Sequence, residues 1–135
     1  MPGWGTGSFE NEDAQSFLGR LNSLGDDDLR QMFIHAADKD YLEAPESGAV
    51  VAAAEVVAAL VASANDETSS PATPRQILDW ISKSKAGPPP DLVEAARQAL
   101  EKVRTNSELK DLWLEAEGLN EWSATLRELK ERLSC

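Results

Sequence analysis

The residues of this sequence whose types and spacing could support chemistry are carboxylates. Glu55 stands within the alanine- and valine-rich run 49–62, so we expect it to be at least partly buried. A buried carboxylate needs hydrogen-bond donors or changes its protonation state. With Glu43 it could line the pocket of an enzyme or of a small-ligand-binding protein. The structural interpretation is that Glu55 accepts hydrogen bonds from the N-terminal segment and anchors it.

A second acidic group follows the lone histidine, His35. Its members are Asp38, Asp40, Glu43 and Glu46. Oxygen ligands of this kind suit a hard cation, but the group lacks the glycine-bearing twelve-residue pattern of a calcium loop. We therefore interpret it as a solvated helix end and predict no metal site. His35 falls off the apolar stripe of its helix, so we expect it to be exposed and without a chemical role.

Nucleophilic and cofactor chemistry have little support in the sequence. The single cysteine, Cys135, is the last residue, where a side chain is rarely held in place. There is no nucleophile-elbow motif, and the glycines at Gly3, Gly5 and Gly7 do not follow a strand as a phosphate-binding loop requires. We assign no catalytic residue, no cofactor-binding residue and no cofactor. A single cysteine also excludes a disulfide within the chain, which fits a reducing cytoplasm.

The net charge of −11 is unevenly distributed along the chain. Residues 1–70 hold thirteen Asp and Glu against three Lys and Arg, and residues 71–135 hold eleven against ten. This balance disfavours binding to nucleic acid or to anionic lipid, and it favours a basic protein partner. The expected acidic interface comprises Asp26, Asp27, Asp28, Asp38 and Asp40. The alternative is a solvated face that only keeps the protein soluble.

Elements that would position these residues follow from hydrophobic periodicity. Apolar residues recur with the helical period throughout, which predicts one all-α domain over residues 1–135, built from six or seven helices. Helices are expected to begin at or after Asn11, Asp26, Glu46 or Ser47, Thr73, Asp91, Ser107 and Asn120, with loops at 65–73 and 86–90. The apolar run 49–62 would span about 21 Å, less than a bilayer core of about 30 Å. It therefore predicts a central buried helix and no membrane span.

Aromatic residues suggest two further sites. Trp4 and Phe9 stand in a glycine-rich opening that would not order itself, so residues 1–10 are predicted to pack against the domain, near Glu55. Trp80 does not share the face of its neighbouring isoleucines cleanly, which makes it the candidate exposed contact aromatic.

The opening residues also carry a resemblance to a known family. The run Trp4-Gly5-Thr6-Gly7-x-Phe9-x-Asn11-x-Asp13-Ala14 resembles the start of the uncharacterised bacterial domain-of-unknown-function family 4259. Tyr41-Leu42-Glu43 with the alanine-rich run 52–59, and residues 107–122, are similar to its later blocks. Glu12 stands where the family more often has Asp. The resemblance implies a compact helical domain and supplies no catalytic residues.

These observations favour a non-enzymatic, cytoplasmic protein-binding domain. Its acidic N-terminal half would bind a basic partner, and an immunity or inhibitor protein acting on a bacterial toxin is one concrete version. The alternative remains an enzyme or a small-ligand-binding protein with a carboxylate pocket around Glu43 and Glu55. The sequence specifies no oligomeric state.

Overall fold

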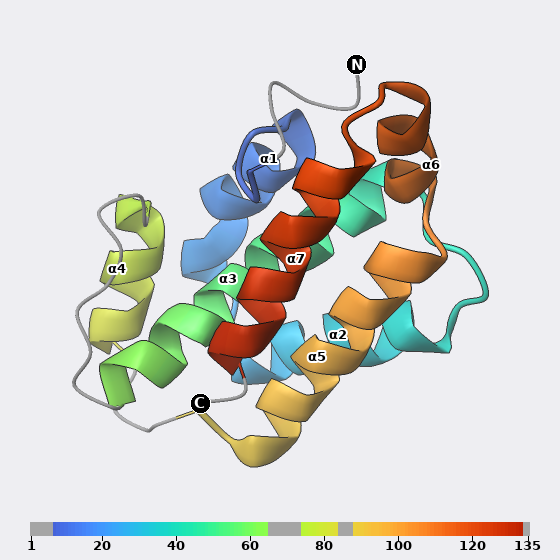
Figure 1. Ribbon diagram of the computed structural model, residues 1–135. Coiled ribbons are helices and arrows are strands. Elements are labelled where there is room, and N and C mark those ends of the chain that lie inside the picture. The colour runs from blue at the N-terminus through green and yellow to red at the C-terminus, as the bar shows by residue number, and fades with distance from the viewer. Residues whose placement is uncertain (1–6, 65–73, 84–87, 134–135) are drawn as a thin grey trace.

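The computed structural model describes residues 7–64, 74–83 and 88–133 (Figure 1). Within these residues the order of elements is α1 (Glu12–Arg20), η1 (Leu21–Ser23), α2 (Asp26–Asp38), α3 (Ala44–Ala64), α4 (Arg75–Lys83), α5 (Pro90–Thr105), α6 (Glu108–Glu115) and α7 (Leu119–Leu133). Helices account for 82% of the described residues, and no strand is present among them. The predicted all-α class is confirmed.

Side-chain caps begin two of the helices as predicted. At the start of α1, the backbone N–H of Ala14 donates to Asn11 Oδ1 at 2.8 Å. At the start of α6, the backbone N–H of Lys110 donates to Ser107 Oγ at 3.1 Å. Each cap satisfies a backbone donor that the first helical turn would otherwise leave without a partner.

Four other helix starts, those of α2, α3, α5 and α7, differ from the prediction. Gly25 rather than Asp26 is the N-cap of α2, because Asp28 Oδ2 accepts from the Gly25 N–H at 2.8 Å. Helix α3 begins at Ala44, before the predicted start. Helix α7 begins at Leu119, so Asn120 lies inside the helix instead of capping it. The predicted loop at 86–90 is described only from residue 88, and α5 already begins at its last residue.

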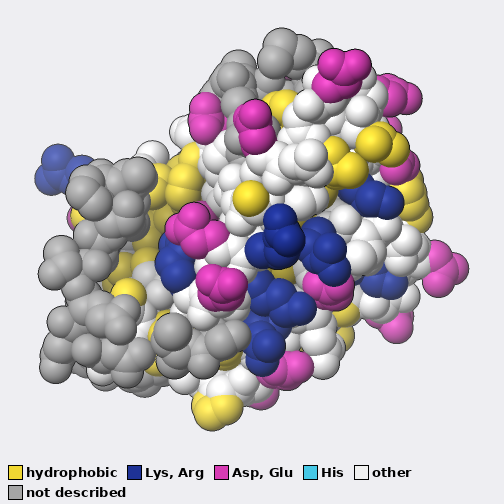
Figure 2. Space-filling model, in the orientation of Figure 1, with side chains coloured by type: hydrophobic (Ala, Val, Ile, Leu, Met, Phe, Trp, Pro, Cys, Tyr) yellow, Lys and Arg dark blue, Asp and Glu magenta, His cyan; other side chains and the backbone are white. Residues whose placement is uncertain are grey.

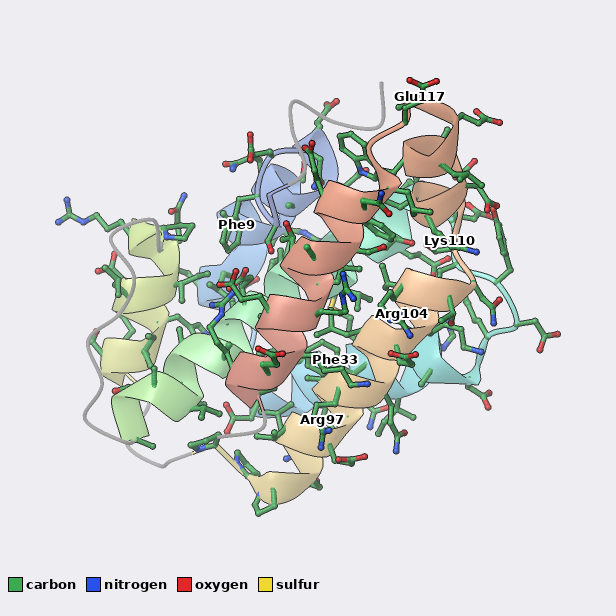
Figure 3. The ribbon with its side chains drawn as sticks, in the orientation of Figure 1. Phe9, Phe33, Arg97, Arg104, Lys110 and Glu117 are labelled. Atoms are coloured by element: carbon green, nitrogen blue, oxygen red, sulfur yellow. The ribbon has the colours of Figure 1, made fainter. Side chains whose placement is uncertain are left out.

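The turn between α6 and α7 shows why a glycine stands at position 118. Glu117 adopts a left-handed backbone with φ 62°, and the Gly118 N–H donates to the Trp113 carbonyl at 2.9 Å. A Cβ on Gly118 would lie 2.6 Å from Trp113 Cε3. That close contact excludes any side chain at 118, and the left-handed position next to it is occupied by a glutamate. Figure 3 labels Glu117 at the tip of this turn.

Helix α3 forms the centre of the hydrophobic core, and each of the other six α-helices of the described chain packs against it (Figure 1). Thirteen of its 21 residues are buried. At Gly48 a Cβ would lie 2.8 Å from Asn11 Oδ1, so the missing side chain lets α1 approach closely. The sequence therefore places its smallest side chains where the helix contacts are tightest.

Helix α3 is longer than the apolar run 49–62, which is too short to span a bilayer. Its 21 residues make it long and apolar enough to cross a membrane by length and composition, since they extend about 31 Å. However, 78% of its most apolar window is buried inside the fold. This burial is what the central helix of a packed core requires, as the sequence predicted.

The connection between α2 and α3 is fastened to the connection between α5 and α6. The Leu42 N–H donates to the Asn106 carbonyl at 3.1 Å, and the Glu108 N–H donates to the Leu42 carbonyl at 2.7 Å. The Leu42 side chain is fully buried between these segments. Residues that flank Leu42 are therefore held at a fixed place beside α6, at the right-hand edge of Figure 1.

Candidate functional site

The predicted acidic interface divides into two groups at opposite ends of α2. Residues 26–28 form the first turn of the helix, Asp38 is its last residue, and Asp40 follows. The helix separates the two groups by about 18 Å along its axis. The structure therefore does not bring the five aspartates together on one surface.

The first acidic group has structural roles. Asp28 closes the N-cap of α2, and Asp27 pairs with Arg30 one turn later. Arg30 Nε also lies 2.7 Å from Asp91 Oδ2 at the start of α5. Its hydrogen bond with Asp91 raises the pKa of Arg30. Asp28 therefore caps α2, and Asp27 and Asp91 share the Arg30 side chain that links α2 to α5, so these three carboxylates are already engaged within the domain.

Three carboxylates of the acidic group that follows His35 are left without partners of opposite charge among the described residues. Asp38, Asp40 and Glu43 are exposed, and within the described chain none of them forms an ion pair. The one cation of this connection, Lys39, is bound at 2.6 Å by Glu46 Oε2 of α3. With Asp111 of α6, described next, these three carboxylates form what we call the acidic edge.

A tyrosine is fixed in the middle of the acidic edge. Tyr41 is 48% exposed, and its hydroxyl donates to Asp111 Oδ2 at 2.6 Å. This hydrogen bond to a carboxylate raises the pKa of Tyr41 to about 12. Glu108 accepts from the Ala44 N–H at 2.8 Å and further ties the connection to α6. Leu114, one turn after Asp111, is 56% exposed, so the edge combines free carboxylates with two exposed apolar groups.

Glu43 and Glu55, the pair of the alternative pocket, lie far apart. Glu43 is exposed just before α3, whereas Glu55 is twelve residues further on, about 18 Å along the helix. The Glu55 side chain is 12% exposed and accepts two hydrogen bonds from Arg132 of α7, Nη1 to Oε1 at 2.9 Å and Nη2 to Oε2 at 3.1 Å. Helix α7 therefore supplies Glu55 with two donors, and the donors predicted from the N-terminal segment stay a prediction. Trp4 and the rest of residues 1–6 lie outside the described residues.

Trp80 is buried, which contradicts its predicted role as an exposed aromatic. It is 8% exposed, and its Nε1 donates to the Leu24 carbonyl at 2.8 Å. Residues 77, 80 and 81 are spaced i, i+3 and i+4, which is one helical face, so the indole packs beside the isoleucines. The exposed apolar residue of α4 is Leu78, 42% exposed. Phe9 is partly buried and packs against the core, in keeping with its predicted packed position.

A groove of about 410 Å³ between α2 and α5 was not predicted from the sequence. It is lined by Gln31, Phe33, Ile34, His35, Ala37, Asp38, Ala95 and Gln98. The exposed His35 therefore borders a cavity, although His35 was given no chemical role. The available sequence signal is the presence of two short side chains, Ala37 on α2 and Ala95 on α5, where the two helices face the groove. Among the described residues no group of three or more His, Cys, Asp and Glu is placed to hold a metal ion.

The fold and this surface define a small all-α domain with a row of exposed carboxylates, none in an ion pair within the part of the chain that the structure describes, along one edge. A family model described as "Domain of unknown function (DUF4259)" matches residues 3–125. The chain belongs to this family. Comparison with curated proteins and with solved structures finds no match.

Proposed function

We propose that this protein is a non-enzymatic protein-binding domain whose acidic edge binds a basic partner protein. The observation that carries the proposal is the set of exposed carboxylates without ion pairs around Tyr41. By contrast, Glu55, Glu94 and Glu101 each have an arginine or lysine within ion-pair distance. Charges left free at one fixed edge are suited to a partner that brings the cations.

The chemistry of the edge supports this kind of recognition. Clustered carboxylates raise the association rate of a basic protein through long-range attraction. The Tyr41 ring offers a face for an arginine or lysine side chain, and Leu114 adds apolar area nearby. Since Leu42 and Asp111 hold the ring in place, little conformational entropy is lost when a partner binds.

An immunity or inhibitor protein that covers the basic surface of a bacterial toxin is the concrete version we propose. The support is the net charge of −11 on a domain of 135 residues, together with the lone cysteine expected of a cytoplasmic protein. The enzyme alternative drew on a carboxylate pocket around Glu43 and Glu55. The separation of those residues and the pairing of Glu55 with Arg132 leave that alternative without support among the described residues.

The test is partner capture followed by kinetics with charge-reversed variants. Proteins retained from the native organism by the wild type are purified, and association rates are measured at low and high salt. Asp38→Lys with Asp40→Lys should lower the low-salt association rate by about tenfold. The control, Asp79→Lys with Glu128→Lys, makes the same change in net charge at exposed positions away from the edge.

The kinetics separate the acidic edge from general charge. We expect the control to change the rate by less than about threefold, and high salt to remove most of the difference between the two variants. Equal losses in both variants, or a rate that is insensitive to both and to salt, would contradict the acidic edge as the binding surface.

A further inference from the structure

We infer that the groove between α2 and α5 is a binding site for an arginine side chain. This inference rests on the proposed function and names the residue of the basic partner that the domain recognises. The groove begins where the acidic edge ends, because Asp38 belongs to both. A partner that meets the edge would therefore have a specific anchor site within reach.

The shape of the groove fits one long side chain. Phe33, labelled in Figure 3, is fully buried at its base, and the short side chains of Ala37 and Ala95 leave the space open. Ile34, 50% exposed, provides an apolar wall. The stretch from Gln31 to Asp38 extends about 10 Å along α2, enough for an extended arginine. The volume of about 410 Å³ falls within the range of small-ligand sites.

The polar groups that line the groove are suited to a cation with several donors. Asp38 is the one carboxylate among the lining residues, and no lysine or arginine lines the groove. Gln31 and Gln98 each carry a carbonyl oxygen that can accept a hydrogen bond. Asp38 also stands at the C-terminal end of α2, where the helix dipole favours a positive charge. A guanidinium group has five donors and can bind a carboxylate through two of them.

Arginine fits this combination better than lysine does. Its guanidinium group is planar and weakly hydrated, so it can reach Asp38 and a glutamine amide together while losing little solvation. Its aliphatic stem can lie against the exposed Ile34 side chain. A lysine ammonium is more strongly hydrated and makes a single point contact, so its binding would depend on charge alone.

The experiment uses small probes that carry one side chain each. N-acetyl-arginine-N-methylamide is titrated into the full-length protein while backbone amide resonances are followed by NMR. The lysine analogue keeps the charge, and the citrulline analogue keeps the shape without the charge. We expect the arginine probe to shift the amides of residues 31–38 and 95–98, to bind more tightly than the lysine probe, and to bind at least roughly tenfold more tightly than the citrulline probe.

Two variants with a matched control locate the site. Asp38→Asn should weaken arginine binding by roughly tenfold, whereas Asp40→Asn, with the same change in charge two residues away and outside the groove lining, should change it by less than about twofold. Ala95→Leu should fill the groove and abolish the shifts while leaving the acidic edge intact. Thermal unfolding of each variant checks that it is folded.

The outcomes distinguish this inference from the proposed function. Shifts spread along the acidic edge, equal losses in Asp38→Asn and Asp40→Asn, or full binding by Ala95→Leu would each overturn the arginine site. The proposed function would still stand if the double variant Asp38→Lys with Asp40→Lys bound the captured partner with a lower association rate than the wild type. Failure of that kinetic test, with the arginine probe still seated in the groove, would overturn the proposed function instead.

Discussion

Carboxylates of the acidic edge and those of the face formed by α5 and α7 differ in their partners. On that face, Glu101 lies between Arg104 and Lys130, and hydrogen bonds from both lower the pKa of Glu101. Figure 2 shows basic side chains gathered over these helices, and Figure 3 labels Arg97 and Arg104 along α5. At the acidic edge, Lys39 is already held by Glu46, so the exposed carboxylates there have no cation.

The comparison shows that acidity in sequence and acidity in space are different properties. Glu55 belongs to the acidic first half of the chain, yet Arg132 from the second half pairs with it. Conversely, Arg30 of the first half pairs with Asp91 of the second half. It also pairs with Asp27, which lies one turn earlier in its own helix. After these pairings, Asp38, Asp40 and Glu43 remain exposed and without an ion pair to any described residue, and they flank the fixed side chain of Tyr41. This smaller set, and not the whole half, is the surface to test.

The largest expected effect comes from detaching the acidic edge from α6. Leu42→Ala removes a fully buried side chain between two connections, and should lower the free energy of unfolding by about 2–5 kcal/mol in urea denaturation. Leu129→Ala, fully buried in α7, should cost a similar amount. Only the Leu42 variant should also weaken binding of the basic partner at temperatures where both are folded. Equal binding by the two variants would show that a fixed edge is unnecessary.

A smaller effect is expected where the paired face is broken. Arg132→Ala leaves the carboxylate of Glu55, which is 12% exposed, without its donors. The free energy of unfolding should fall by about 1–3 kcal/mol. Arg127→Ala, also on α7 and exposed, has no ion pair among the described residues and should change stability by less than about 0.5 kcal/mol. If both variants were equally stable, the ion pair between Glu55 and Arg132 would contribute nothing to the free energy of unfolding. The contrast between the paired face of α5 and α7 and the acidic edge would then be weaker.

Local patterns predicted the helices well, because helix formation depends on periodicity and caps that are close in sequence. Asn11 and Ser107 were identified as caps from their positions alone, and the side-chain hydrogen bonds confirm them. Trp80 shows how a local pattern can be misjudged, since its spacing from Ile77 and Ile81 already placed it on the buried face. The predicted class of fold followed from these signals.

The candidate site was less predictable because it depends on which distant segments meet. Nothing local in the sequence indicates that Leu42 pairs with residues 106–108, or that Tyr41 reaches Asp111 seventy residues later. Glu55 meets Arg132 because α3 packs against α7. That packing decides which of the chain's lysines and arginines lies beside Glu55. Side chains brought together in this way are visible only once the helices are placed.

The smallest expected effect, and the most direct report on the acidic edge, is the titration of Tyr41. It is the only tyrosine of the sequence, so the ultraviolet absorbance of phenolate reports on one group. In the folded protein its pKa should be about 12, because the Asp111 carboxylate accepts the hydroxyl hydrogen bond. The unfolded chain should titrate at about 10. The stabilising contribution of this bond is therefore fully present below pH 10 and is lost as the pH rises toward 12.

Asp111→Asn should move the midpoint of Tyr41 down toward 10, since the neutral amide no longer disfavours the phenolate. Asp79→Asn makes the same change in charge on α4, and we expect it to leave the midpoint unchanged. Circular dichroism along the titration separates deprotonation of the folded protein from unfolding, since unfolding would bring the midpoint to about 10 in every variant. A wild-type midpoint near 10 in a chain that is still helical would mean that Tyr41 is not held by Asp111 in solution. The tyrosine would then be a mobile surface residue, and the acidic edge would lose the fixed ring that sets it apart from the other exposed carboxylates.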